Sequence, residues 1–122
     1  MCVPDYELST VFNAKRLGMF IQAVNTKDAE LMKFALQDRL HQPYRMKLVP
    51  GLDKIIENLK HEENVLGCVL SGAGPAIIVI SQKNNLDKIK SIIKDTWEDM
   101  NVKVNIMTLP VENNGAQIIT HE

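Results

Sequence analysis

The chain has 122 residues, 45% of them hydrophobic and 24% charged, which is enough apolar material to bury a core and excludes a disordered chain. Its 14 basic and 15 acidic side chains leave a net charge of -1, so no overall field recruits nucleic acid or an anionic membrane. We expect no signal segment, and no apolar run approaches the about 20 residues that cross a bilayer. Cys2 and Cys68 lie far apart without metal-site spacing, which argues against zinc or a disulfide framework and fits a reducing cytoplasm.

The first part of the chain predicts a short strand and then a helix. Residues 2–10 suit an extended segment, because Pro4 restrains the residue before it and the side chains around it favour strands. From residue 11 apolar side chains recur at helical spacing, in the stripe Leu17, Phe20, Ile21 and Val24. Asn25 and Thr26 then offer a break and a new N-cap.

Two further helices are expected before residue 60. The second helix carries Asp28 and Glu30 in its first turn, where acidic groups suit the helix dipole, and Pro43 ends it. Its apolar stripe is Ala29, Met32, Leu36 and Leu40. After a connection that ends at Pro50, the third helix presents Leu52, Ile55, Ile56 and Leu59 on one face.

A hairpin and a long helix are expected next. Residues 65–71 and 76–81 are rich in β-branched side chains and are separated by the turn formers "GAGP", which predicts a β-hairpin. Asn84 or Asn85 caps a fourth helix, whose stripe is Leu86, Ile89, Ile92, Ile93, Trp97 and Met100. Residues 102–109 alternate apolar and polar side chains as a strand does, and residues 115–120 offer a last strand.

The expected order of strand, helices, strand, strand, helix and strand is the split β-α-β pattern. We therefore expect an α+β fold of the ferredoxin-like kind, in which an antiparallel sheet has helices packed on one face and extra helices in the first crossover. Because no internal repeat or linker divides the chain, residues 1–122 are expected to form a single domain.

The stretch "LSGAGPAIIVI", residues 70–80, is the first candidate for a site. It fails the Walker A pattern, because no Lys-Ser/Thr follows the second glycine, and Ile77 stands where the dinucleotide fingerprint needs glycine. Two alternatives stay open: a plain hairpin turn, or a loop that offers N–H groups and a hydroxyl to a phosphate or carboxylate. The loop residues are Ser71, Gly72, Ala73 and Gly74, followed by Pro75, which has no N–H.

Arg45 is the second candidate, because it follows a proline at the end of "DRLHQPYR". An arginine in a stiff loop suits bidentate recognition of a carboxylate or phosphate, and the alternative is a solvated loop arginine. Thr10 offers a hydroxyl, although such residues more often serve turns or caps. No acidic pair has the spacing of a metal site or of a general acid and base, so no metal ligand or catalytic residue is assigned.

Two longer stretches, "DRLHQPYRMKLVPGLD" and "GCVLSGAGPAIIVI", resemble the C-terminal half of the homoserine kinase family in the GHMP kinase superfamily. "SGAGP" marks the superfamily, and "HQPYR" with "VPGLD" narrows it to this family. The resemblance extends to "VPDYELST", "VFN" and "NNGAQI", and so covers nearly the whole chain.

This resemblance implies transfer of the γ-phosphoryl group of ATP to the hydroxyl of L-homoserine, with Mg²⁺, in threonine biosynthesis. The family binds ATP and Mg²⁺ mainly in an N-terminal kinase domain, whose phosphate loop this sequence lacks, so we interpret the chain as the C-terminal domain and expect no kinase activity from it alone. That N-terminal domain is the implied partner, and the family implies a homodimer. By the same resemblance, residues 71–75 close over the active site, Arg45 holds the substrate, and Thr10 and Gly72 line its pocket.

The sequence departs from the family at two places. Family members carry a further stretch between the "ELST" strand and the "VFN" helix, with another substrate-binding arginine, whereas here Thr10 runs directly into Val11. Ala76 stands where serine or threonine is frequent. Two other functions stay open: another small-molecule kinase of the superfamily, whose substrate needs no carboxylate clamp, and a stand-alone ferredoxin-like ligand-binding module.

Overall fold

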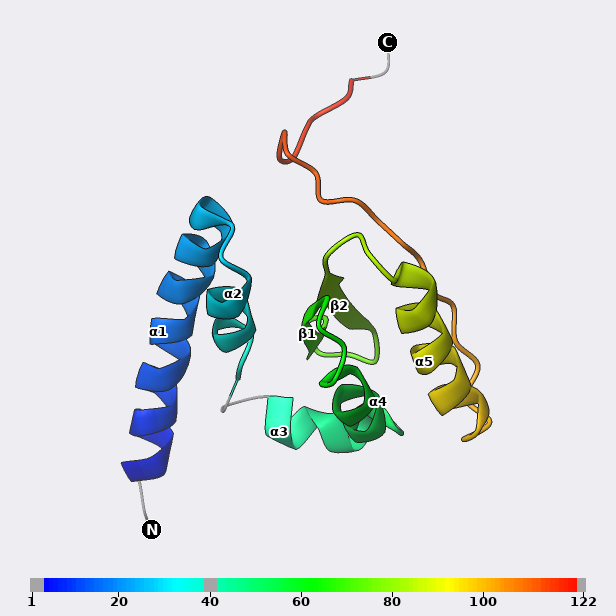
Figure 1. Ribbon diagram of the computed structural model, residues 1–122. Coiled ribbons are helices and arrows are strands. Elements are labelled where there is room, and N and C mark those ends of the chain that lie inside the picture. The colour runs from blue at the N-terminus through cyan, green and yellow to red at the C-terminus, as the bar shows by residue number, and fades with distance from the viewer. Residues whose placement is uncertain (1–3, 39–41, 121–122) are drawn as a thin grey trace.

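The computed structural model describes residues 4–38 and 42–120, and its fold is α+β, as expected (Figure 1). In Figure 1 the two strands lie in the middle, with α1 and α2 to their left, α5 to their right and α4 below them. The elements are α1 (Pro4–Thr26), α2 (Ala29–Ala35), α3 (Gln42–Arg45), the 3₁₀ helix η1 (Met46–Leu48), α4 (Leu52–Leu59), β1 (Val65–Leu70), β2 (Ile77–Ser81) and α5 (Leu86–Glu98).

The predicted hairpin is confirmed. β1 and β2 pair antiparallel, with Leu70 opposite Ile77 and a register irregularity between Val65 and Gly67. Alternate side chains of the hairpin point to its two faces, so each face can pack against a different layer of helix.

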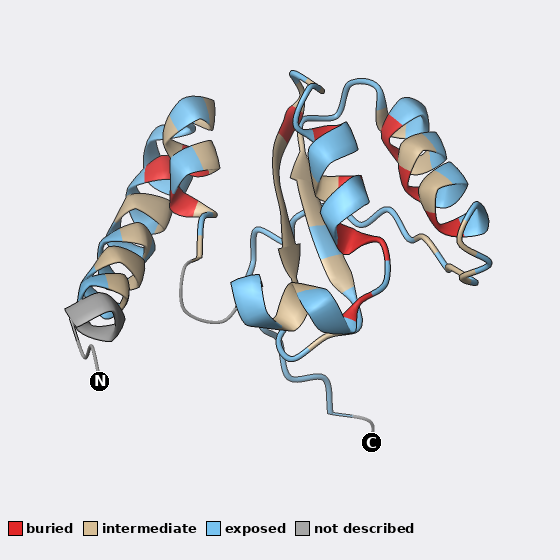
Figure 2. Ribbon diagram, turned by 90° about the horizontal axis from the view of Figure 1, so that it is seen from below, coloured by how far each residue is buried: buried red, intermediate tan, exposed pale blue. Residues whose placement is uncertain are grey.

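The hydrophobic core lies between one face of the hairpin, α4 and α5, and both helices agree with the sequence analysis. The buried positions lie on the inner sides of these helices (Figure 2). On α4, Leu52 and Ile55 are 0% exposed, because apolar residues recur there at the helical period. On α5 the buried residues are Ile89, Ile93 and Trp97, spaced by four. The indole Nε1–H of Trp97 donates to the carbonyl of Pro50 at 2.7 Å, which ties the end of α5 to the turn before α4.

Helices cover both faces of the hairpin, not one face as expected. α2 packs on the face opposite α4 and α5, where a Cβ on Gly67 would run into the side chain of Leu36. The absence of a side chain at Gly67 therefore lets α2 approach β1 closely.

Replacing Gly67 with alanine is expected to lower the free energy of unfolding by about 1–3 kcal/mol, because the added methyl overpacks the contact with Leu36. Chemical denaturation followed by circular dichroism measures the change. Gly18→Ala is the matched control: no atom lies within 4 Å of the added methyl there, and alanine stabilises a helix interior by up to about 1 kcal/mol. Equal effects of the two substitutions would contradict the close approach of α2 to Gly67.

The predicted strand at residues 2–10 is wrong for its described part, because residues 4–10 begin the helix α1. Residues 2 and 3 lie outside the described residues. Proline is favoured at the first position of a helix, and no glycine or second proline separates Pro4 from the helical stretch after Val11. With Thr10 joined directly to Val11, the helix extends back through residues that suit a strand in isolation.

The second helix is confirmed, but both of its ends differ from the prediction. Its N-cap is Asp28, whose carboxylate accepts the N–H of Leu31 at 2.9 Å, after a reversal at Lys27 with φ 55°. The helix ends at Ala35, and Leu40 of the predicted stripe lies outside the described residues. Pro43 does not end this helix; it stands in the first turn of α3, where its missing N–H costs no hydrogen bond.

The two predicted C-terminal strands are wrong. Val102, Val104 and Ile106 pack against the core while Lys103 and Asn105 are exposed, so the alternation is real, but residues 102–109 form no strand. Residues 115–120 are exposed and irregular. A strand needs backbone partners, and in the described part of the chain the sheet consists of β1 and β2 alone.

The thiol of Cys68 lies on the core side of β1, and burial raises its pKa from 9.0 to about 11. The folded chain therefore holds the thiol proton more tightly than the unfolded chain does. This difference contributes fully to the free energy of unfolding below pH 9, and the contribution is lost as the pH rises towards 11. We expect the free energy of unfolding to fall more steeply over this interval in the wild type than in Cys68→Ala. Chemical denaturation at several pH values between 9 and 11 measures this dependence. If the free energy of unfolding fell equally with pH in the wild type and in Cys68→Ala, the raised pKa would be contradicted.

Candidate functional site

The candidate site joins α3 to the loop between β1 and β2. One guanidinium nitrogen of Arg45, Nη1, donates to the carbonyl oxygen of Gly72 at 3.2 Å. The structure thus brings together two of the residues singled out in the sequence, although 27 positions separate them.

The glycine loop is a tight turn. The N–H of Ser71 donates to the carbonyl of Ala76 at 2.9 Å, and the N–H of Gly74 donates to that of Ser71 at 3.1 Å. Gly72 and Gly74 have φ angles of 59° and 83°, in the left-handed region that glycine tolerates best. The hairpin-turn alternative is therefore confirmed, and the turn does not exclude a ligand.

Two adjacent N–H groups of this loop stay available for a ligand. Within the described residues, the backbone N–H groups of Gly72 and Ala73 make no hydrogen bond, and both residues are exposed. Consecutive N–H groups in a left-handed turn suit an oxygen of a carboxylate or phosphate. Pro75, also exposed, offers no N–H.

The guanidinium of Arg45 also keeps donors for a ligand. No carboxylate among residues 4–38 and 42–120 forms an ion pair with it, and its hydrogen bond to Gly72 uses one of its five N–H groups. Arginine and loop together present positive charge and N–H donors, so their chemistry suits an anionic group.

Two further residues that the sequence analysis missed hold α3 in place. The side-chain oxygen Oε1 of Gln42 accepts the N–H of Leu70 at 3.3 Å, at the end of β1. The N–H of Gln42 in turn donates to the carboxylate of Asp38 at 2.9 Å. Nothing in the local sequence signals the role of Gln42, because the partner of its side chain lies 28 positions away.

Thr10 lies elsewhere. It is an exposed residue in the N-terminal half of α1, and α1 packs mainly on α2, so Thr10 is not part of the contact between Arg45 and Gly72. Its predicted role in the substrate pocket stays a prediction.

The described residues do not fit ATP with Mg²⁺. They contain no group of three or more side chains that would hold a metal ion. The glycine loop runs from one strand into another, so no helix N-terminus adds its dipole to the loop. Two N–H groups and one arginine suffice for a single carboxylate or phosphate group, and a nucleotide with its metal needs more donors and ligands than these.

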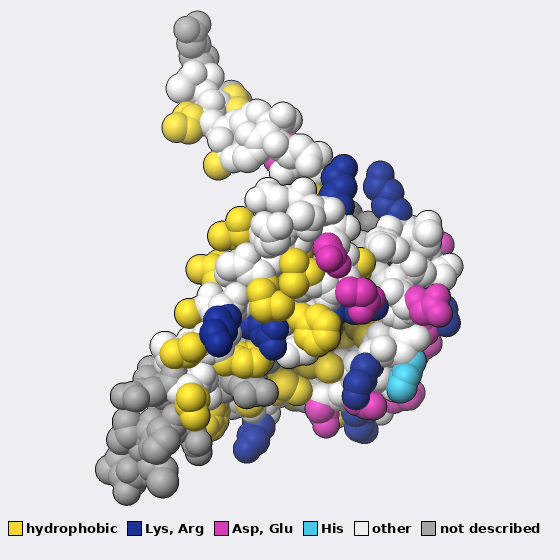
Figure 3. All heavy atoms as spheres, turned by 60° about the vertical axis from the view of Figure 1, so that its left-hand side comes forward, with side chains coloured by type: hydrophobic (Ala, Val, Ile, Leu, Met, Phe, Trp, Pro, Cys, Tyr) yellow, Lys and Arg dark blue, Asp and Glu magenta, His cyan; other side chains and the backbone are white. Residues whose placement is uncertain are grey.

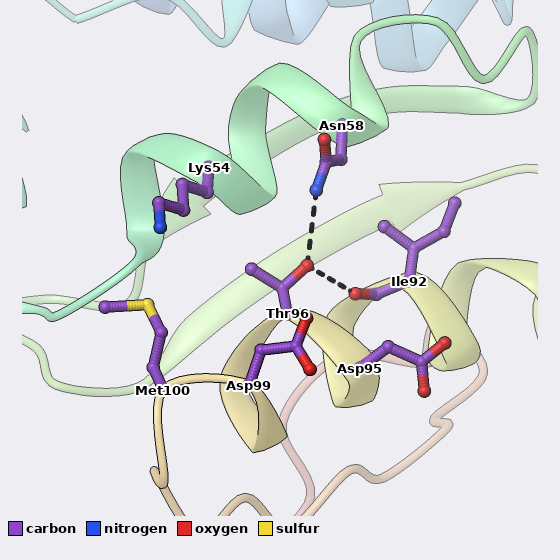
Figure 4. A pocket seen from close by; sticks show the side chains of 7 residues that line it. All are labelled: Lys54, Asn58, Ile92, Asp95, Thr96, Asp99 and Met100. Atoms are coloured by element: carbon purple, nitrogen blue, oxygen red, sulfur yellow. Dashed lines mark hydrogen bonds between the residues drawn. The ribbon is translucent and has the colours of Figure 1, made fainter.

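A groove of about 490 Å³ lies between α4 and α5, away from these residues (Figure 4). The amide nitrogen of Asn58 donates across it to the hydroxyl of Thr96 at 3.3 Å, and that hydroxyl donates to the carbonyl of Ile92 at 2.7 Å. Its other lining side chains are Lys54, Asp95, Asp99 and Met100. No residue of the predicted site lines this groove.

The family described as GHMP kinases C terminal matches residues 20–99 of the chain. The chain belongs to this family. The matched residues include α3, the hairpin and the loop between its strands. The contact between Arg45 and Gly72 therefore lies inside the region that matches the GHMP kinase family.

Its relatives include the homoserine kinase of Caldicellulosiruptor bescii, 38% identical over 136 aligned residues, and that of Synechococcus sp., 32% identical over 134. Each alignment covers 97% of this chain and 44% of the relative, so this GHMP kinase chain spans less than half the length of the curated relatives it matches. Both alignments are longer than the 122 residues of the chain, so each relative has residues within the aligned region that this chain lacks.

A solved structure shares the fold of this GHMP kinase chain: the crystal structure of homoserine kinase from Cytophaga hutchinsonii, with a TM-score of 0.71. The match covers 83% of this chain and 31% of that chain at 24% identity, a level at which the likeness concerns the fold alone. In the described part of the chain, we find no helix with the length and apolar character needed to span a membrane.

Proposed function

We propose that this chain is the substrate-binding part of a homoserine kinase, which orients L-homoserine for phosphoryl transfer from ATP. The observation that carries the proposal is the hydrogen bond from Arg45 to Gly72, because it joins the two motifs that resemble this family into one anion-binding surface. Relatives that align with nearly the whole chain bear the name homoserine kinase, which supports this substrate over other superfamily substrates.

In the proposed complex, the free N–H groups of Arg45 and of the glycine loop bind the α-carboxylate of L-homoserine. Catalysis of phosphoryl transfer depends on positioning of the two substrates and on stabilisation of charge more than on covalent catalysis by the protein. A substrate held by a planar arginine and a rigid turn has few orientations for its hydroxyl, and orientation is what this chain contributes. ATP and Mg²⁺, which its described residues do not fit, are assigned to a nucleotide-binding half.

We propose that this nucleotide-binding half is the main partner. Val11, Leu17, Ile21 and Val24 are more than half exposed on α1, and Figure 3 shows hydrophobic side chains gathered on the side of the molecule where α1 lies. Exposed apolar side chains gathered on one side of a molecule are typical of a surface that another domain covers. A homodimer, which the family implies, and a cytoplasmic location, which the cysteine usage fits, complete the proposal.

Titration of the chain with L-homoserine, followed by nuclear magnetic resonance, tests the function. We expect millimolar binding, with the largest shifts at the amides of Gly72 and Ala73 and at the side chain of Arg45. L-Homoserine amide, which keeps the side-chain hydroxyl but has no carboxylate, is the matched control and should not bind. Absence of binding would overturn the proposal, whereas micromolar binding without ATP would favour a stand-alone amino-acid-binding module.

A further inference from the structure

Asp38 connects α1 to α3 through both oxygens of its carboxylate. Oδ1 accepts a hydrogen bond from the side-chain amide of Asn13 at 2.6 Å, and Oδ2 accepts one from the backbone N–H of Gln42 at 2.9 Å. Asn13 lies on α1, Gln42 is the first residue of α3, and both hydrogen bonds are partly buried. Water therefore competes less for them than it does at an exposed pair.

The short helix that carries Arg45 depends on such contacts. α3 has four residues and the following η1 has three, and isolated helices of this length are not stable in water. Asp38 and Leu70 hold the start of α3 through Gln42, and the bond from Arg45 to Gly72 forms at its end. If the start of α3 were attached less firmly, we expect the helix to rotate and Arg45 to lose its contact with the glycine loop.

We propose that Asp38 is a positioning residue for substrate binding: by accepting from Asn13 and Gln42 at once, it fixes the direction in which Arg45 meets the glycine loop. The inference rests on the proposed function, in which Arg45 binds the substrate carboxylate. In it, Asp38 orients Arg45 without touching the substrate itself.

Substitutions at Asn13 and Asp38 can remove the hydrogen bonds of the Asp38 carboxylate and then restore them. In Asp38→Asn, one amide oxygen faces two N–H donors, so one of the two hydrogen bonds is lost. In Asn13→Asp, two carboxylates face each other and repel. In the exchange Asn13→Asp with Asp38→Asn, the new amide oxygen accepts from Gln42 and the new amide N–H donates to the carboxylate at position 13, so both bonds return. Asp87→Asn, an exposed position in the first turn of α5, controls for the loss of one negative charge.

Two readouts on the whole chain test the proposal. We expect Asp38→Asn to move the resonances of Arg45 Nε and of the Ala73 amide while that of the Trp97 indole stays in place, and to weaken L-homoserine binding by about tenfold. The exchange should return the resonances and bring affinity to within about threefold of the wild type. If Asp38 only stabilised the fold, Asp38→Asn would also move the Trp97 resonance and lower the melting temperature. The exchange would then not restore the Arg45 and Ala73 resonances selectively.

The proposal is overturned if Asp38→Asn leaves the Arg45 resonance where the wild type has it, if Asp87→Asn has the same effect, or if the exchange fails to restore the resonance. The resonance measurements need no ligand. If the wild type binds no L-homoserine, the proposed function fails, while movement of Arg45 in Asp38→Asn and its return in the exchange still establish the positioning role.

Discussion

Arg45→Ala is expected to weaken L-homoserine binding to the chain by about ten- to a hundredfold, which corresponds to the loss of about 1.5–3 kcal/mol from charge-assisted hydrogen bonds. The substitution removes the side chain that donates to Gly72 and also the free donors proposed for the carboxylate. Arg45→Lys should fall between the wild type and alanine, because an ammonium keeps the charge but lacks the planar fork.

Lys47→Ala is the matched control for this prediction. Lys47 is an exposed cation of η1, two positions beyond Arg45, and it forms no ion pair with the described residues. Its removal changes the local charge equally and leaves the contact with Gly72 intact, so affinity should change by less than about twofold. Equal losses in the two variants would show that a general positive field, not the geometry of Arg45, attracts the substrate.

Trp97→Ala is expected to have the largest effect on stability, about 3–5 kcal/mol, because it opens a cavity in the core. The indole is 7% exposed and packs in the same cluster as Leu52 and Ile55 of α4. A loss of this size is comparable to the whole stability of many small domains, so we expect the chain to be largely unfolded at 37 °C. Circular dichroism is the suitable probe, since Trp97 is the single tryptophan of the chain.

Trp97→Phe separates packing from hydrogen bonding at the same position. Phenylalanine keeps most of the apolar volume but leaves the carbonyl of Pro50 without its donor, so we expect a loss of about 1–2 kcal/mol. Equal melting temperatures for the phenylalanine and alanine variants would mean that packing of the ring contributes little, and would contradict the position of Trp97 in the core.

The sequence was most informative where local pattern and burial coincide. Leu52 and Ile55 on α4, and Ile89 and Ile93 on α5, recur at the helical period because each helix buries one face. The glycine loop was predicted as a turn because two strand-forming runs flank it. At residues 4–10 the same kind of reasoning was wrong, since strand propensity is weak beside continuation of a helix through Val11.

Strand prediction at residues 102–109 was wrong for a different reason. The alternation of Val104 and Ile106 with polar neighbours reports which side chains face the core, and that part is correct. It does not report whether a backbone partner is in reach, and strand formation depends on that partner.

From the sequence alone follow the α+β class, the hairpin with its glycine turn, the two core helices, and the choice of Arg45 and residues 71–75 as candidates for a site. Only the tertiary structure decided that α2 covers the second face of the hairpin, that Arg45 reaches Gly72, and that Asp38 joins α1 to α3. The reason is physical: periodicity and turn propensity act within a few residues of the chain, whereas these hydrogen bonds join groups up to 27 positions apart and exist only after the helices have packed.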